Sequence, residues 1–202
     1  MPLPDDENRL KPRKSPLQRR SVETVRVVLE AAARILERDG FAGYTTNAVA
    51  ALAGVSVGSL YQYFPNRDAI TAALIERETA QLLEDVSLTA SAADFDCALL
   101  TLLRAAVTHQ MRRPGLARLL DLEEGRLPVK ATVRRVSGEL QQSLLAILAR
   151  PDAPPVEAVE VAAWDLLAMI KGMVDGAGER GEIDSEYLLG RVERAVRGYL
   201  KG

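Results

Sequence analysis

The sequence predicts an all-α fold, and three observations support that expectation. Ala, Leu, Glu and Arg recur at three- and four-residue spacing almost throughout the 202 residues, and no convincing segment alternates apolar and polar residues as a half-buried strand would. Hydrophobic residues make up 48% of the chain but aromatic residues only 4%, which favours aliphatic helix packing. Particular glycines and prolines mark where helices begin or end, namely Gly40, Gly54, Pro114, Pro151, Pro154 and Pro155.

The first expected helix begins with Ser21 as its N-cap and runs to about Asp39. Its apolar residues recur at helical spacing, which gives the helix one face that can be buried. Gly40 follows the last turn, where glycine adopts a left-handed conformation at low cost, and Phe41 returns the chain to the core. The apolar face consists of Val22, Val25, Leu29, Ala32, Ala33 and Leu36.

Two short helices are expected next, from Thr46 to Ala53 and from about Ser56 to Tyr63. Gly54 suits the left-handed position after the earlier helix, and Ser56 is a good N-cap for the later one. The later helix is too short to be stable alone, so it must be held by packing. The residues expected to face the core are Ala48, Val49, Leu52, Leu60 and Phe64.

Longer helices are expected in the rest of the chain. Asn66 is positioned to cap the first of them, the stretch from Ser87 to Ala93 interrupts the pattern, and Pro114 suits the start of another helix. Pro151, Pro154 and Pro155 mark a later boundary. The expected helices cover residues 67–87, 95–112, 114–124, 129–149, 156–177 and 185–201.

Charge is unevenly distributed along a chain whose net charge is −2. Residues 1–67 hold ten Lys or Arg against seven Asp or Glu, a net charge of +3, whereas residues 68–202 carry −5. The amino-terminal part is therefore suited to a polyanion such as DNA. Residues 1–20 are expected to form a disordered basic arm that contacts phosphates or enters the minor groove, or that only adds solubility. Its cations are Arg9, Lys11, Arg13, Lys14, Arg19 and Arg20.

The two short helices and their surroundings resemble the DNA-binding domain of the TetR family of bacterial transcriptional repressors. The resemblance covers about residues 22–86 without a gap. It rests on Thr46, on Gly54-Val55-Ser56 and on the run from Leu60 to Ile70, preceded by Ala31-Ala32 and Gly40-Phe41. It implies a helix-turn-helix DNA-binding domain at residues 21–66. Residues 67–202 would then form a helical effector-binding and dimerisation domain, with residues 67–87 as a linking helix.

The resemblance also implies which residues contact DNA. Asn47 would bond an adenine edge and Val57 would pack on a thymine methyl group. Tyr61 and Tyr63 resemble the family's backbone-clamping aromatics, although a core-packed ring is the alternative for Tyr61, and Arg67 stands where a phosphate contact is expected. The expected DNA-binding residues are Thr46, Asn47, Val57, Gly58, Ser59, Tyr61, Gln62, Tyr63 and Arg67.

An effector pocket is expected among the later helices, because their residues supply more apolar surface than polar groups. The ligand should be small and mostly apolar. The alternative is that most of these apolar residues simply form the core. Gln110 is a further candidate polar anchor. The candidate ligand-binding residues are Leu103, Thr108, His109, Met111, Leu120, Gln141, Trp164, Asp165 and Met169.

The last two helices each carry an apolar stripe, and two such hairpins pairing about a two-fold axis would make a four-helix bundle. This arrangement resembles the family's dimer interface and predicts a homodimer on a pseudo-palindromic operator. The alternative is that the stripes pack on the chain's own middle helices. They are Val156, Val159, Ala163, Leu166, Leu167, Ile170 and Val174, then Leu188, Leu189, Val192, Ala195, Val196 and Tyr199.

Several other functions are disfavoured by context. The Gly54–Gly58 run matches a serine-hydrolase elbow, but it follows a helical pattern rather than a strand. The Gly176–Gly181 run matches a dinucleotide-binding motif, yet it also follows a helix. His109 is the only histidine and makes no metal site with recognisable spacing, so neither metal nor cofactor is expected. The single cysteine, Cys97, is expected to be a small core residue.

Location and function follow from these expectations. No apolar run approaches the length of about 18 residues that a membrane span needs, and no signal peptide is evident, so a cytoplasmic protein is expected. We expect no enzyme but a ligand-responsive transcriptional regulator, most simply a repressor that an effector releases from its operator. The alternative is a helical dimeric adaptor that binds proteins without specific DNA binding.

Overall fold

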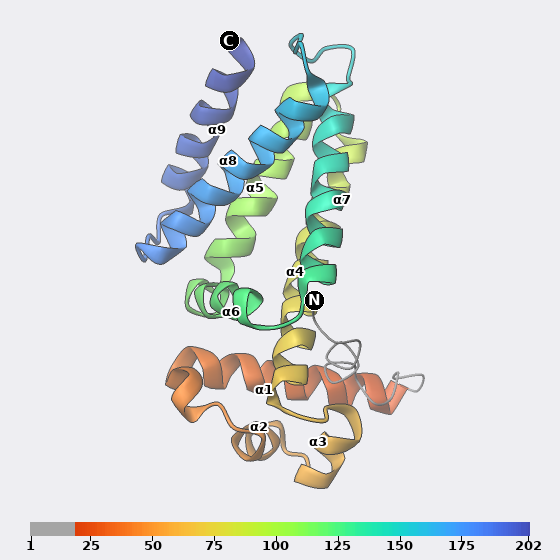
Figure 1. The fold of residues 1–202 in the computed structure, drawn as a ribbon, viewed down its shortest axis with the longest axis vertical. Coiled ribbons are helices and arrows are strands. Elements are labelled where there is room, and N and C mark those ends of the chain that lie inside the picture. Colours follow the sequence, from red (N-terminus) through yellow and green to blue (C-terminus); the bar gives the residue numbers. More distant parts are fainter. Residues whose placement is uncertain (1–18) are drawn as a thin grey trace. The chain divides into compact units, whose positions relative to one another are not determined.

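A computed structural model describes residues 19–202 of the chain, and within that range it contains nine α-helices, one short 3-10 helix and no strand. The all-α prediction is therefore confirmed. Residues 1–18 of the expected basic arm lie outside the described residues. Arg19 and Arg20, which were expected to be disordered, belong to α1 instead. The helices are α1 Arg19–Gly43, α2 Thr46–Ala53, α3 Val57–Tyr63, α4 Arg67–Ser87, η1 Leu88–Ser91, α5 Phe95–Arg112, α6 Pro114–Arg126, α7 Lys130–Leu148, α8 Val159–Glu179 and α9 Ser185–Lys201 (Figure 1).

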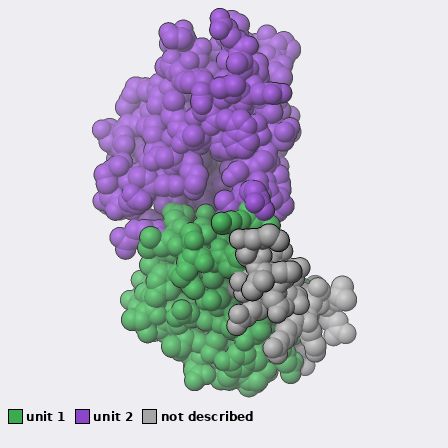
Figure 2. Space-filling view, viewed as in Figure 1, with its two compact units in different colours: residues 1–77, 119–131 green, residues 78–118, 132–202 purple. Residues whose placement is uncertain are grey.

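The chain divides into two compact units, which Figure 2 colours separately. Unit 1 takes in residues up to Arg77 together with Leu119–Ala131, and unit 2 consists of Glu78–Arg118 and Thr132–Gly202. Helices α4, α6 and α7 therefore each contribute residues to both units.

Unit 1 is built around a core that α1, α2, α3 and the start of α4 share. Helix α1 begins at Arg19, so Ser21 lies inside the helix and is not its N-cap, which corrects the expected start. Gly40 has a φ of 60° and interrupts α1 where the sequence predicted its end. The fully buried side chains include Val28, Ile35, Leu36, Val49, Leu60, Phe64, Ile70 and Leu74.

The turn between α2 and α3 is held by local hydrogen bonds. The Thr45 hydroxyl accepts a bond of 3.1 Å from the amide of Ala48, and the Ser56 hydroxyl accepts one of 3.0 Å from Ser59. Gly54 has a φ of 68°, so the predicted left-handed turn is confirmed. Leu52 was expected to face the core, but its side chain is 46% exposed, whereas Val49 and Ala50 are buried.

Unit 2 has its own apolar core, in which α5, α8 and α9 pack side by side (Figure 1). Asp94 caps α5 by accepting a bond of 2.7 Å from the amide of Cys97, and Asp184 caps α9 through the amide of Tyr187. Cys97 itself is exposed in the first turn of α5, so the expectation of a core cysteine was wrong.

The apolar stripes of α8 and α9 face this core rather than a partner. Their buried members are Ala163, Leu166, Ile170, Val174, Leu188, Leu189, Val192 and Val196. The prediction that these residues make a dimer contact was wrong, because they pack within their own chain and are covered. Packing on the chain's own middle helices, the alternative, is what the structure has.

Candidate nucleic-acid interface

Helix α3 presents a small, mostly polar surface on a buried anchor. Leu60 is its one buried residue, and Phe64 caps its end from within the core. Val57, Gly58, Tyr61 and Gln62 are exposed, while Ser59 and Tyr63 are half-buried. Such an arrangement leaves the first turn of a short helix open to a major groove.

The start of α2 lies beside this surface. The hydroxyls of Thr46 and Tyr61 are 3.2 Å apart, within hydrogen-bond distance, and join α2 to α3. Asn47 is exposed next to Thr46. The Ser56 and Ser59 hydroxyls are also hydrogen-bonded to each other, at 2.8 Å. The structure thus brings the sequence-predicted residues of α2 and α3 onto neighbouring positions.

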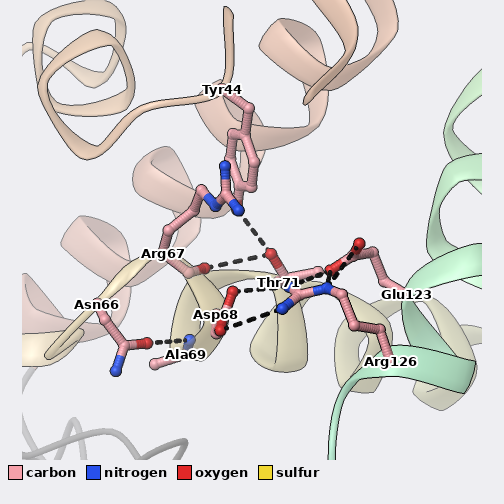
Figure 3. A network of polar contacts seen from close by, with 8 residues as sticks. All are labelled: Tyr44, Asn66, Arg67, Asp68, Ala69, Thr71, Glu123 and Arg126. Atoms are coloured by element: carbon pink, nitrogen blue, oxygen red, sulfur yellow. Dashed lines mark hydrogen bonds and ion pairs between the residues drawn. The ribbon is translucent and has the colours of Figure 1, made fainter. Parts of the chain in front are cut away.

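The start of α4 carries a third group of polar side chains (Figure 3). Asn66 caps the helix as predicted, because its Oδ1 accepts a bond of 2.8 Å from the amide of Ala69. The exposed Arg67 guanidinium lies 5.8 Å from the centre of the Tyr44 ring, a cation–π distance. The Thr71 hydroxyl is 3.2 Å from the Tyr44 hydroxyl. Burial raises the pKa of Tyr44 to about 12, so its hydroxyl stays neutral beneath Arg67.

Arg126, at the end of α6, is bonded to the same helix start. Figure 3 shows its contacts with Asp68 and Glu123. Its Nη2 lies 2.7 Å from Asp68 Oδ1, and its Nε lies 3.0 Å from Glu123 Oε1. Hydrogen bonds to Glu123 and then to Asp68 raise the pKa of Arg126, and Glu123 is only 8% exposed. Asp68 and Arg126 are far apart in sequence, and no local pattern links them. Sequence reasoning therefore missed Arg126, Glu123, Thr71 and Tyr44.

The sequence-predicted ligand residues do not form one group. On α5, Leu103 is buried, His109 and Met111 are half-buried, and Thr108 is exposed. Half-buried Met169 of α8 packs against the same core. Burial lowers the pKa of His109, which favours the neutral ring. Leu120 belongs to unit 1 rather than unit 2.

The remaining candidates lie on other surfaces of unit 2. Trp164 is 50% exposed on α8, and the exposed Asp165 accepts a bond of 2.7 Å from the Tyr199 hydroxyl. Gln141 lines a groove between α4 and α7. Gln110 is only 2% exposed, and its Nε2 has no hydrogen-bond partner among residues 19–202.

The described residues contain neither a metal-site cluster nor a membrane-spanning helix. Between residues 19 and 202, no three His, Cys, Asp or Glu side chains gather as a metal site would. Over the same range, no helix combines the length and apolar character that crossing a membrane requires. The outward surface of α2, α3 and the start of α4 includes a short helix-turn-helix pair, an arrangement typical of DNA-binding transcriptional regulators.

Two family models match the chain over both of its parts. The model described as bacterial regulatory proteins, tetR family, matches residues 28–74, and the one described as tetracyclin repressor-like, C-terminal domain, matches residues 94–200. The chain therefore belongs to the TetR family of bacterial transcriptional regulators, as the sequence motif predicted.

Solved structures share the fold at low sequence identity. A TetR transcription regulator from Haloarcula marismortui ATCC 43049 is 19% identical with a TM-score of 0.74, covering 89% of this chain and 97% of that chain. A putative transcriptional regulator from Pseudomonas aeruginosa PAO1 is 23% identical with a TM-score of 0.71, covering 94% of each chain.

One curated relative matches part of the chain. The nucleoid occlusion factor SlmA of Glaesserella parasuis serovar 5 (strain SH0165) is 29% identical over 82 residues. Those residues are 41% of this chain and 41% of that relative, so the chain spans about two fifths of the relative's length in the match.

Proposed function

We propose that this transcriptional regulator acts as a homodimer on a pseudo-palindromic operator and that a small, mostly apolar effector releases it. The observation that carries the proposal is the outward surface of α3. Leu60 is buried beneath it, whereas Val57 and Tyr61 remain exposed at a helix whose start is capped by Ser56. Val57 is 38% exposed and Tyr61 is 40% exposed.

Each group on this surface has a distinct role toward DNA. The small residues Val57, Gly58 and Ser59 let the start of α3 enter the major groove, where Val57 packs on a thymine methyl group. Tyr61 and Arg67 contact phosphates, which position the protein without reading sequence. Because Val57 and Gly58 offer few hydrogen bonds to bases, sequence recognition rests more on Asn47, Gln62 and DNA shape.

The outer face of α8 and α9 supports a homodimer. Trp164 and Val161 of α8 and Tyr187 of α9 are exposed large apolar side chains. A Cβ atom added at Gly172 of α8 or Gly198 of α9 would meet no atom within 4 Å, so a second helix can approach these positions closely. We assign this face to a second copy of the chain, in place of the buried stripes.

Fluorescence anisotropy tests the proposal most directly. The protein is titrated against labelled fragments of the DNA that flanks its own coding region, at two salt concentrations and with excess nonspecific competitor. Competitor-resistant, salt-sensitive binding to one fragment supports a sequence-specific regulator and identifies the operator. If the competitor displaces every fragment equally, regulation at the protein's own locus is rejected.

Tyr61→Phe tests the interface at one atom. Loss of the hydroxyl should weaken operator binding by about 0.5 to 1.5 kcal/mol, because a phosphate contact and the bond to Thr46 are both removed. Thermal unfolding should change little, because the bond to Thr46 is exposed to water. Thr101→Val, which removes a hydroxyl from α5 of unit 2, is the control and should leave operator affinity unaltered. An unchanged affinity for Tyr61→Phe would assign that ring to packing alone.

The second candidate function is a helical dimer that binds a protein and has lost specific DNA binding. The exposed apolar side chains of α8 and α9 favour it, because such side chains also suit a different protein partner. Salt dependence separates the two functions. Phosphate contacts make log K fall with log salt by about 0.9 per neutralised phosphate, whereas an apolar protein interface shows little slope.

A further inference from the structure

A groove of about 540 Å³ lies within unit 2, between the second half of α4 and helix α7. Its volume falls within the range of about 300 to 1,000 Å³ that small-molecule sites occupy. Both walls come from helices, so the groove needs no loop to be formed. Of the residues that the sequence singled out for ligand binding, Gln141 is the one that lines it.

The α4 wall of the groove supplies an apolar surface. Val86 is buried and Leu83 is half-buried, and their spacing of three residues places them on the same face of the helix. Val86 is only 2% exposed, so the apolar surface that a ligand body would remove from water belongs mainly to Leu83. The wall therefore favours a ligand with a hydrocarbon or aromatic body.

The α7 wall of the groove carries an excess positive charge. Arg135 is paired with Glu139, with 2.8 Å between Nη1 and Oε1, so those two groove residues neutralise each other. Arg134 lies beside them, is exposed, and has no ion pair or hydrogen bond to any of residues 19–202. The groove thus keeps one guanidinium available, and a guanidinium binds carboxylate, sulfonate or phosphate oxygens in a planar, bidentate manner.

Gly138 keeps the α7 wall open. It lies inside a helix, where glycine is less favourable than alanine, and its backbone does not need the left-handed conformation. Packing does not need glycine either, because a Cβ atom there would meet nothing within 4 Å. The missing side chain leaves space in the groove, next to Arg134 and opposite the apolar surface of α4.

We propose that this groove binds an amphipathic monoanion, with its apolar body against Leu83 and its charged oxygens at Arg134. Resting on the proposed function, the inference makes this ligand class the effector of the regulator. Helix α4 forms one wall of the groove and also carries Arg67 at its first residue. A ligand that binds against α4 more tightly in one of its positions shifts the population of that position.

A pair of fluorescent probes tests the ligand class on the full chain without DNA. One probe is 8-anilino-1-naphthalenesulfonate, which has an apolar aromatic body and one anionic group. The other is N-phenyl-1-naphthylamine, which has the same body without the sulfonate. The anionic probe should bind saturably and at least about tenfold more tightly than the neutral probe. Equal affinities, or no saturable binding of the anionic probe, would overturn the proposed class.

Substitutions test whether the probe binds in the groove. Arg134→Gln should bring the affinity of the anionic probe down to that of the neutral one, while Arg118→Gln, at an exposed arginine outside the groove, should change neither. Gly138→Phe should fill the groove and weaken both probes at least about tenfold, whereas Gly138→Ala adds one methyl group and should not. Circular dichroism establishes that each variant folds. Unaltered binding in both Arg134→Gln and Gly138→Phe would reject the groove.

The regulatory role has a separate readout. With a red-fluorescent operator, the anionic probe should lower operator affinity at least about fivefold in the unmodified chain and have no effect in Gly138→Phe. An unchanged operator affinity at saturating probe would reject the effector role. Failure to find any operator would reject the proposed function, while the probe titrations would still decide whether the groove binds the monoanion.

Discussion

Unit 1 and unit 2 differ in how far the chain's own residues complete them. In unit 1 the buried polar groups at the start of α4 are paired, Tyr44 with Thr71 and Glu123 with Arg126. In unit 2 Gln110 is buried without a partner for Nε2 among residues 19–202, and Trp164 and Tyr187 are 50% and 62% exposed. Hydrogen bonds fix the polar groups beside the start of α4 in unit 1, whereas Trp164 and Tyr187 leave apolar surface on unit 2 that another protein chain is suited to cover.

The largest expected effect concerns helix α3 of unit 1. Leu60→Ala should lower the free energy of unfolding by about 2 to 5 kcal/mol, because it removes a buried anchor and leaves a cavity under α3. Leu52→Ala makes the same chemical change at an exposed position and should cost less than about 1 kcal/mol. Urea unfolding followed by circular dichroism compares the two. Equal losses would mean that α3 is not anchored through Leu60.

The next effect concerns a surface of unit 2. Trp164→Ala should weaken dimerisation by about 2 to 4 kcal/mol, since large aromatic side chains dominate interfaces. Leu88→Ala, at another exposed apolar residue of unit 2, should leave the dimer intact. Analytical ultracentrifugation over a range of concentrations measures both. If Trp164→Ala dimerises as tightly as the unmodified chain, the dimer contact lies on another surface.

A smaller effect is expected inside unit 2, where Gly178 and Gln110 approach closely. A Cβ atom at Gly178 would lie 2.2 Å from Gln110 Nε2, so Gly178→Ala should cost about 1 to 3 kcal/mol of stability. Combining it with Gln110→Ala should recover part of that cost, because the obstructing side chain is gone. Thermal unfolding of the single and double variants gives the coupling. Strictly additive losses would show that the contact does not limit packing.

The smallest effect is expected at Asp68, in an ion pair of unit 1. Asp68→Asn should cost less than about 1 kcal/mol, because this pair is partly exposed and screened by salt. Arg126→Met should cost more, about 1 to 3 kcal/mol, since it leaves the buried Glu123 carboxylate without its partner. Urea unfolding at low and high salt measures both. A larger loss for Asp68→Asn than for Arg126→Met would contradict the idea that Glu123 is the residue that most needs Arg126.

Residues close in sequence carried most of what the sequence predicted correctly. Gly54, Ser56 and Asn66 act through the backbone within a few residues, so the bounds of α2, α3 and α4 followed from them. Periodicity also identified the apolar stripe of α9, but it does not say which neighbour covers a stripe. The stripe was therefore predicted to contact a partner chain, whereas it packs on the core of its own chain.

Contacts between distant residues account for the rest. Arg126 and Asp68 are joined only after α6 returns to the start of α4, and neither stands in a motif. Leu52 was expected in the core because it follows Val49 by three residues. A helix as short as α2 buries a narrower face than that spacing implies, so Leu52 is exposed. The candidate ligand residues were chosen by type alone, and the fold distributes them over several surfaces.

The return of the chain to unit 1 has a consequence for protein engineering. Leu120, Leu127 and Val129 are buried members of that unit, although they come from the segment Leu119–Ala131. Cutting the chain after α4 would strip these side chains from the fragment and expose the surface they cover. The DNA-binding half is therefore not a portable cassette, and a chimera that exchanges it must transplant Leu119–Ala131 as well.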